Sequence, residues 1–184
     1  MARNIEVKAA LPQGLEALLP RARACADGEA ERIDQDDEFF AVPQGRLKLR
    51  RFADGSAELI HYHRADGTGA RASDYVRVPA PDPDALAQAL GRALGRHGRV
   101  RKQRWLLLAG QTRIHLDRVE GLGDFMELEV VRHDGQSDAE GQAIAEALMQ
   151  RLGLADAPRV AGAYRDLLAG KPVAGGGPAP VRYR

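Results

Sequence analysis

The sequence is poor in several features that would assign a protein to a common functional class. Cys25 is the single cysteine among 184 residues, which excludes an intramolecular disulfide and a zinc site built from cysteines. Aromatic residues make up 5% of the chain, too few to predict a surface that stacks nucleic-acid bases. Lys and Arg total 27 against 26 Asp and Glu, so the net charge of +1 creates no field that would attract DNA or a membrane.

Long apolar runs are also missing. The first residues, MARNIEVKAALP, carry charges where a signal peptide needs an apolar stretch, and no run reaches membrane-spanning length. With 44% hydrophobic and 29% charged residues, the composition is that of an ordinary globular protein. We therefore expect a cytoplasmic protein without membrane association. We also expect one domain over residues 1–170 and a disordered Gly/Pro-rich tail over residues 171–184.

Alternation of polar and apolar residues predicts about eight β-strands, with helices between and after them. The strands are predicted at residues 3–10, 29–40, 45–52, 57–64, 73–78, 99–108, 111–119 and 125–132. Helices are predicted at residues 14–26, 81–96, 137–152 and 157–169, the third because Ser137 and Glu140 have the spacing of a capping box. The pattern therefore indicates an α+β protein.

The charged residues share one face of each predicted strand. Arg46, Lys48 and Arg50, for example, alternate with Leu47 and Leu49. A half-exposed antiparallel sheet also alternates, but its polar face would include Thr, Ser and Gln, whereas these positions are nearly all ionisable. Amphipathic helices need apolar surfaces to cover. If they cover the apolar strand faces and the sheet closes, the charged faces line a barrel interior of small-ligand width.

Charges in such an interior must be paired, coordinated to a metal or neutralised by a ligand. The cations are Lys8, Arg46, Lys48, Arg50, Lys102, Arg104 and Arg113, and the carboxylates are Glu6, Asp117, Glu127 and Glu129. These seven cations and four carboxylates cannot all satisfy one another. A polyanion suits the cations and a divalent metal suits the carboxylates, a combination typical of metal–phosphate chemistry.

Five strings carry a resemblance to a known family. They are Asn4-Ile5-Glu6-Val7-Lys8, the basic strand at residues 45–50, the strand at residues 100–105, the run at residues 113–129 and the helix at residues 163–168. In order and spacing they resemble the CYTH proteins, or triphosphate tunnel metalloenzymes, which include class IV adenylyl cyclases and thiamine triphosphatases. The resemblance covers residues 3–169, and the run at residues 113–129 is most similar to the class IV cyclase branch.

The resemblance implies a closed eight-stranded antiparallel β-barrel, the triphosphate tunnel, with helices packed outside and with Mg²⁺ or Mn²⁺ as cofactor. By position, the metal ligands would be Glu6, Glu127 and Glu129, with Asp117 ligating the metal or orienting its water. Phosphate oxygens would be held by Lys8, Arg46, Lys48, Arg50, His63, Lys102, Arg104 and Arg113. Lys8, Asp117 and Arg50 would be the catalytic residues.

Two positions depart from the family pattern. Asn4 stands where the N-terminal ExExK motif has its first carboxylate, so it offers a neutral oxygen and leaves open whether one or two metals bind. His63 aligns with a lysine and is only partly charged near neutral pH. These departures leave open a repurposed protein that acts on or binds another anionic metabolite.

The sequence thus predicts a metal-dependent enzyme whose partner is a small-molecule triphosphate or nucleotide, with a homodimer permitted. Triphosphate hydrolysis is favoured narrowly over cyclisation of ATP to cyclic AMP, because no nucleobase pocket is identified. The basic stretch at residues 92–104 lacks interleaved aromatics and a known nucleic-acid module, so we expect no nucleic-acid binding.

Three smaller expectations concern residues around the tunnel. We expect His61, His63 and His115 to line it, and the acidic run at residues 34–38 to be a solvated edge. We expect Trp105 to pack outward against a helix, since it shares parity with Arg101.

Overall fold

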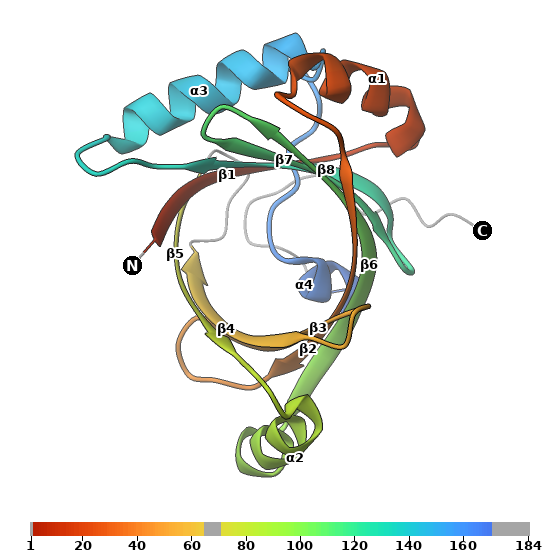
Figure 1. Cartoon of the computed structure of the whole chain (residues 1–184), viewed down its shortest axis with the longest axis vertical. Helices are drawn as coiled ribbons and strands as arrows, with labels where there is room; N and C mark the ends of the chain where they lie inside the picture. The colour runs from red at the N-terminus through yellow and green to blue at the C-terminus, as the bar shows by residue number, and fades with distance from the viewer. Residues whose placement is uncertain (1, 65–70, 171–184) are drawn as a thin grey trace.

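The computed structural model describes residues 2–64 and 71–170, in which eight strands and four helices form a barrel with attached helices (Figure 1). The strands are β1 (Ala2–Ala10), β2 (Glu31–Phe40), β3 (Arg46–Phe52), β4 (Ala57–Arg64), β5 (Arg71–Pro79), β6 (Arg96–Ala109), β7 (Thr112–Val119) and β8 (Gly123–Val131). The helices are α1 (Leu15–Cys25), α2 (Pro83–Leu94), α3 (Asp138–Arg151) and α4 (Tyr164–Leu168). The tail predicted at residues 171–184 lies outside the described residues.

The sheet closes on itself in the order β1-β5-β4-β3-β2-β6-β7-β8, with all neighbours antiparallel. Strand β1 closes the barrel by pairing with β8 on one side, where Lys8 lies opposite Glu127, and with β5 on the other. A closed barrel leaves no unpaired strand edge. The predicted α+β fold, a closed eight-stranded antiparallel barrel with helices outside, is confirmed.

The apolar core lies between the barrel wall and the helices, not inside the barrel. Helices α1 and α3 cover β1, β7 and β8 (Figure 1), where Leu18 and Met149 pack against Ile5, Leu116 and Leu128. Burying one such side chain stabilises the fold by roughly 1.5–3 kcal/mol. Because this packing takes place on the outer face, the inward-pointing residues of each strand can be polar. Trp105 also packs against this outer cluster, as expected.

Helix α2 covers a second, smaller cluster on the opposite side of the barrel, where Ala87 meets Phe40 and Leu49 (Figure 1). It begins after Asp82, whose side chain accepts a hydrogen bond from the Ala85 amide, and ends at Gly95, which has φ 80°. The helix is therefore shorter than predicted, and strand β6 begins earlier, at residue 96. None of the described helices combines the length and apolar character that crossing a membrane requires.

The helix predicted at residues 157–169 is mostly wrong, because only residues 164–168 are helical. Pro158 and Gly162, which has φ 80°, interrupt a helix there. The preceding segment instead runs beside β1, where Arg159 bridges to Ala9 and the Val160 amide donates to the Lys8 carbonyl. This path brings α4 to one end of the barrel, where Tyr164 packs against Phe39 and Val100.

Candidate functional site

The inward-pointing residues of the eight strands surround a cavity of about 330 Å³. Charged residues dominate its middle, and they come from every strand. Those that line the cavity are Glu6, Lys8, Asp37, Lys48, Arg50, Glu58, Arg77, Lys102, Arg104, Arg113, His115, Glu127 and Glu129. The two ends of the barrel differ. We call them the α4 end and the mouth.

Segment 159–168 lies across the α4 end. Tyr164 is buried there with Phe39, Val100 and Phe125, so an apolar and aromatic cluster covers this end of the cavity. The mouth is the end where β2 and β4 begin and where β3 and β6 finish. Its side chains include Phe52, which is partly exposed, and Arg77, which is 52% exposed. A ligand would therefore enter and leave through the mouth.

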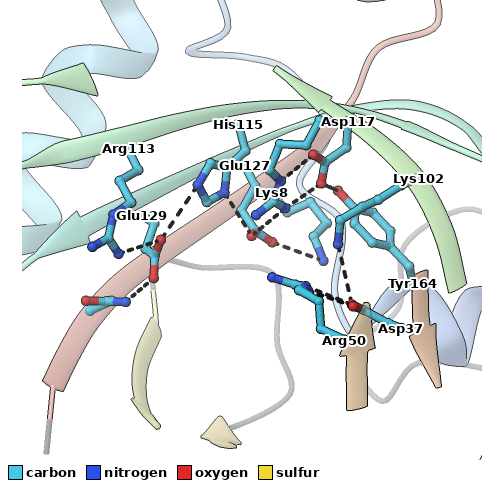
Figure 2. Close-up of polar contacts among 12 residues, drawn as sticks. Lys8, Asp37, Arg50, Lys102, Arg113, His115, Asp117, Glu127, Glu129 and Tyr164 are labelled. Carbon is cyan, nitrogen blue, oxygen red and sulfur yellow. Dashed lines mark hydrogen bonds and ion pairs between the residues drawn. The ribbon is translucent and has the colours of Figure 1, made fainter. Parts of the chain in front are cut away.

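One side of the cavity is a basic wall organised around a buried carboxylate, Asp37 of β2 (Figure 2). Arg50 donates two hydrogen bonds to Asp37, at 2.6 and 2.7 Å, and Lys48 donates one at 2.8 Å. The Lys102 ammonium lies 3.7 Å from the same carboxylate. Burial alone would raise the pKa of Asp37, but the charges of Arg50, Lys48 and Lys102 hold it well below its usual range. Three cations therefore share one carboxylate, which leaves this wall with a net positive charge.

The two lysines of this wall have lowered pKa values, so they lose a proton more readily than an exposed lysine does. Burial and the charge of Arg50 lower the pKa of Lys48 to about 8, although Asp37 acts in the opposite direction. Burial and the charge of Arg104 likewise place the pKa of Lys102 well below its usual range. Both groups would be stabilised as ammonium ions by an added anion.

A second unit fixes Arg104 between the two walls. Both carboxylate oxygens of Asp117 accept hydrogen bonds from Arg104 at 2.6 Å, and one also accepts the Tyr164 hydroxyl at 3.0 Å (Figure 2). Burial alone would raise the pKa of Asp117, but the charge and hydrogen bonds of Arg104 lower it to about 2. Arg104 also lies 3.7 Å from Glu127. Asp117 therefore orients a guanidinium that faces the cavity.

The opposite side is an acidic wall formed by β1, β7 and β8. Glu127 lies 3.3 Å from the Lys8 ammonium, and Glu129 accepts a hydrogen bond from Arg113 at 3.1 Å. His115 lies between the two carboxylates, 3.6 Å from Glu127 and 3.7 Å from Glu129 (Figure 2). Glu6 is directly opposite Glu129 in the strand register. Three carboxylates thus face one region of the cavity.

The donor set of this wall fits a hard divalent cation, although the ligands are not gathered around a centre. Mg²⁺ and Mn²⁺ prefer oxygen ligands, and three glutamates supply them. The Asn4 side-chain oxygen is fully buried and accepts no hydrogen bond from the residues that the structure describes, while its amide nitrogen donates to Glu129. An unpartnered oxygen beside a carboxylate favours a cation. Among the described residues, no three acidic, histidine or cysteine side chains are already arranged around one point, so metal binding requires these carboxylates to turn away from their present partners.

The structure does not bring Asp117 to the three glutamates as a fourth ligand. It is fully buried, and Arg104 and Tyr164 already bond to its oxygens. Its place is next to Arg104. The geometry therefore supports a role for Asp117 in orienting Arg104.

His61 and His63 do not line the tunnel, contrary to expectation. Both are exposed, and they alternate on β4 with Ile60 and Tyr62, which face the cavity. The His61 ring contacts the Gln44 carbonyl at 3.1 Å. The phosphate contact expected for His63 is wrong because its side chain points to the outer face. His115 is the one histidine of the three that lies inside.

Arg46 lies apart from the other predicted phosphate ligands, near the α4 end. It donates a hydrogen bond of 3.0 Å to Asp166 of α4 and lies 5.9 Å from the Tyr62 ring. The other predicted cations, Lys8, Lys48, Arg50, Lys102, Arg104 and Arg113, all line the cavity. Arg46 therefore holds α4 in place in this structure.

Sequence reasoning missed two central residues. Asp37 was expected on a solvated edge, but it is 1% exposed and organises the basic wall. Its parity with Phe39 and its place opposite Arg50 could have indicated an inward position. Tyr164 lies within the helix predicted at residues 157–169, and the sequence gives it no role in the site. Its contact with Asp117 joins positions far apart in the chain, and no local pattern signals it.

The basic stretch on the outer face is largely paired. Arg99 donates to Asp36 at 2.6 Å, and Arg101 lies 3.4 Å from the same carboxylate. Arg96 contacts Glu38. These ion pairs reduce the positive charge that a nucleic acid would meet, and the absence of nucleic-acid binding stays a prediction.

Comparison with solved structures identifies the same fold in proteins of several organisms. A protein of Pyrococcus horikoshii has a TM-score of 0.79 at 23% identity and covers 89% of this chain and 98% of its own. A protein of Vibrio parahaemolyticus, provisionally named an adenylate cyclase, has a TM-score of 0.73 at 20% identity, over 90% of this chain and 97% of its own. A Hippeastrum protein, provisionally an adenylyl cyclase with a dominant triphosphatase activity, has a TM-score of 0.66 at 16% identity, over 95% and 98%.

At these identities the likeness shows the fold alone, and no curated protein matches the chain. The family is shown by a different comparison. The model of the CYTH domain matches residues 2–164, which include all eight strands and the first residue of α4. The chain therefore belongs to the CYTH domain family.

Proposed function

We propose that this protein is a divalent-metal-dependent enzyme that acts on a triphosphate, with hydrolysis as its reaction. The observation that carries the proposal is the pairing of two walls across one cavity. The basic wall has three cations around the single carboxylate of Asp37, and the acidic wall has three glutamates. Phosphoryl transfer depends mainly on positioning and on stabilising charge, which these walls supply.

The cations of the chain would bind the phosphate oxygens. Arg50 suits bidentate contact with two oxygens, whereas Lys48 and Lys102 act as point charges. Asp37 keeps these groups oriented in the absence of ligand, and a phosphate takes over part of its contacts. Lys8 is 3% exposed and lies 4.1 Å from the Tyr164 ring, so it offers a desolvated charge at the inner end of the cavity.

A bound Mg²⁺ or Mn²⁺ would be held by Glu127, Glu129 and Glu6 and would neutralise phosphate charge and polarise the scissile bond. Arg104, fixed by Asp117, stabilises the negative charge that develops on the transferring group or its leaving oxygen. Arg113 lies at the other edge of the acidic wall and holds Glu129 in position.

Hydrolysis is preferred over cyclisation because the same walls suffice for attack by water. The named activities of structures with this fold include both reactions, and triphosphatase activity is the dominant one in the Hippeastrum protein. The idea of a repurposed protein is weakened, since His63 lies outside the cavity and leaves Asn4 as its only basis.

The proposal is tested by incubating the protein with Mg²⁺ or Mn²⁺ and ATP, thiamine triphosphate or inorganic tripolyphosphate, and by identifying the products. Release of phosphate is expected with at least one of them, and chelation by EDTA should stop it. Cyclic AMP as the main product from ATP would replace hydrolysis by cyclisation. No turnover of any triphosphate would contradict the proposal.

Triphosphate affinity should fall as pH rises above about 8. Lys48 has a pKa of about 8 in the free protein, and a bound polyanion raises that pKa because it favours the charged form. Above pH 8, binding therefore requires Lys48 to take up a proton, which weakens the affinity. Below pH 8, Lys48 is already protonated, and binding involves no proton uptake. We expect KM to rise in that range for the wild type and to stay flatter in Lys48→Arg, whose guanidinium remains charged. Equal pH profiles for the two proteins would contradict the role of Lys48.

A further inference from the structure

His115 is a buried histidine of the acidic wall that has no role in the proposed reaction. It is 4% exposed, lines the cavity, and lies directly opposite Glu127 of β8 in the strand register. Its neighbours on β7, Ile114 and Leu116, belong to the apolar core outside the barrel. Because side chains alternate along a strand, this packing directs the imidazole inward. The fold therefore holds the ring beside the carboxylates.

The ring lies between two glutamates without forming a hydrogen bond to either. Nδ1 lies 3.6 Å from a carboxylate oxygen of Glu127, and Nε2 lies 3.7 Å from one of Glu129 (Figure 2). Both distances exceed the usual length of a hydrogen bond. Nδ1 is buried and has no hydrogen-bond partner among the described residues. Since a buried polar atom without a partner is costly, a ligand that binds this nitrogen would be favoured.

A second unpartnered atom lies on the same wall. Asn4 approaches one oxygen of Glu129, to which its amide nitrogen donates, and His115 approaches the other oxygen. The buried Asn4 oxygen accepts no hydrogen bond from the part of the chain that the structure describes. The wall therefore offers lone pairs of two kinds, from carboxylate and amide oxygens and from an imidazole nitrogen. A metal ion bound here would meet both kinds of donor.

A nitrogen donor changes which metal ion the wall prefers. Mg²⁺ is a hard ion that binds oxygen ligands and gives up its water reluctantly. First-row transition ions also bind imidazole, with an affinity that rises from Mn²⁺ to Co²⁺. When one nitrogen of an imidazole binds a metal, the other commonly donates its N–H to a carboxylate, which fixes the ring. His115 has a glutamate beside each nitrogen, so it suits this arrangement.

We propose that His115 is a nitrogen ligand of the metal and that it makes the cavity select a first-row transition ion over Mg²⁺. This inference rests on the proposed function in one respect, because it takes the acidic wall as the metal site. It adds a ligand and a choice of metal. A histidine that only separated the two glutamates would not be bonded to the ion. A spectroscopic signal from the bond therefore distinguishes the two roles.

The test is pulsed electron paramagnetic resonance of the protein with Mn²⁺, alone and with pyrophosphate. A coordinated imidazole modulates the electron spin echo through its nitrogen, whereas a carboxylate has no nitrogen to do so. We expect this modulation in the wild type and its loss in His115→Asp, which offers oxygen instead. His115→Leu removes the donor without adding a charge. His63→Ala removes an exposed histidine on the outer face and is the matched control that should keep the signal.

Titration calorimetry gives a second readout, after thermal unfolding has shown that each variant folds. His115→Leu should bind Mn²⁺ about 10-fold more weakly or worse, since loss of even an outer-shell partner costs that much. Its affinity for Mg²⁺ should change less than about twofold, because that ion gains little from nitrogen.

The outcomes separate this inference from the proposed function. Nitrogen modulation without turnover of any triphosphate would reject the function and leave the ligand assignment in place. Mn²⁺ bound without nitrogen modulation, or with modulation that persists in both His115 variants, would overturn the assignment even if the enzyme is active. Failure of the wild type to bind Mn²⁺ under either condition would overturn it as well.

Discussion

Replacing Glu129 with glutamine is expected to lower metal-dependent turnover by roughly 10²–10³-fold, as expected when a central electrostatic group is removed. Glu129 and Glu127 are two residues apart on β8 and project into the same cavity. With Asn4 in place of an acid, these two glutamates supply most of the negative charge available to a metal. Glutamine keeps the shape of the side chain and removes only its charge.

The fold should survive this change, because Glu129 faces the cavity and belongs to no apolar cluster. Binding of an anion without metal should be unchanged or tighter, since one repulsive charge is gone. Glu120→Gln, at a site 71% exposed, is the control. Steady-state assays and thermal unfolding make the comparison. Unchanged turnover would show that the metal site is wrongly assigned, and loss of both activity and folding would indicate a structural ion pair with Arg113.

Replacing Asp117 with alanine is expected to destabilise the protein by about 3–5 kcal/mol, because it removes the hydrogen-bonded partner of a buried arginine and leaves only the more distant Glu127. Arg104 is 7% exposed, and Asp117 accepts both of its hydrogen bonds as well as that of Tyr164. Asp36→Ala is a matched control, since Asp36 pairs with Arg99 and Arg101, which are each 51% exposed. That loss should stay below about 1 kcal/mol.

The pH dependence of stability gives an independent readout. Burial alone would raise the pKa of Asp117, but Arg104 lowers it to about 2, below the value of about 4 in an unfolded chain. The stabilisation is therefore fully present above pH 4 and is lost as pH falls from about 4 towards 2. Urea unfolding should show a weaker acid dependence in Asp117→Asn than in the wild type. Similar free energies of unfolding for Asp117→Ala and Asp36→Ala would contradict this account.

The barrel could be predicted from the sequence because its walls have two different faces. Over residues 46–50 of β3 and 126–130 of β8, charged residues alternate with apolar ones, and a shift of one residue would turn these charges into the core. Strand β4 lacks this contrast, since Leu59, Ile60, His61 and Tyr62 mix both kinds. The sequence therefore did not determine which face of β4 points into the barrel, and His63 was predicted on the inner face, whereas it lies on the outer one.

The chemistry of the cavity was harder to predict than its walls. Alternation identifies which cations face inward, but not which acid lies between them. Asp37 stands among four other acidic or polar residues. Its burial follows from its register opposite Arg50 on β3 and from the Lys102 ammonium of β6, which lies 3.7 Å away. The position of Tyr164 depends on the path of the preceding segment along β1, which Pro158 and Gly162 permit.

The most direct test of the central claim is a crystal structure with Mn²⁺ and a non-hydrolysable triphosphate, using the anomalous signal to locate the metal. We predict phosphates against Lys102 and Arg50, with manganese beside Glu127 and Glu129. Phosphates or manganese bound only on the outer face, with the cavity empty, would contradict it.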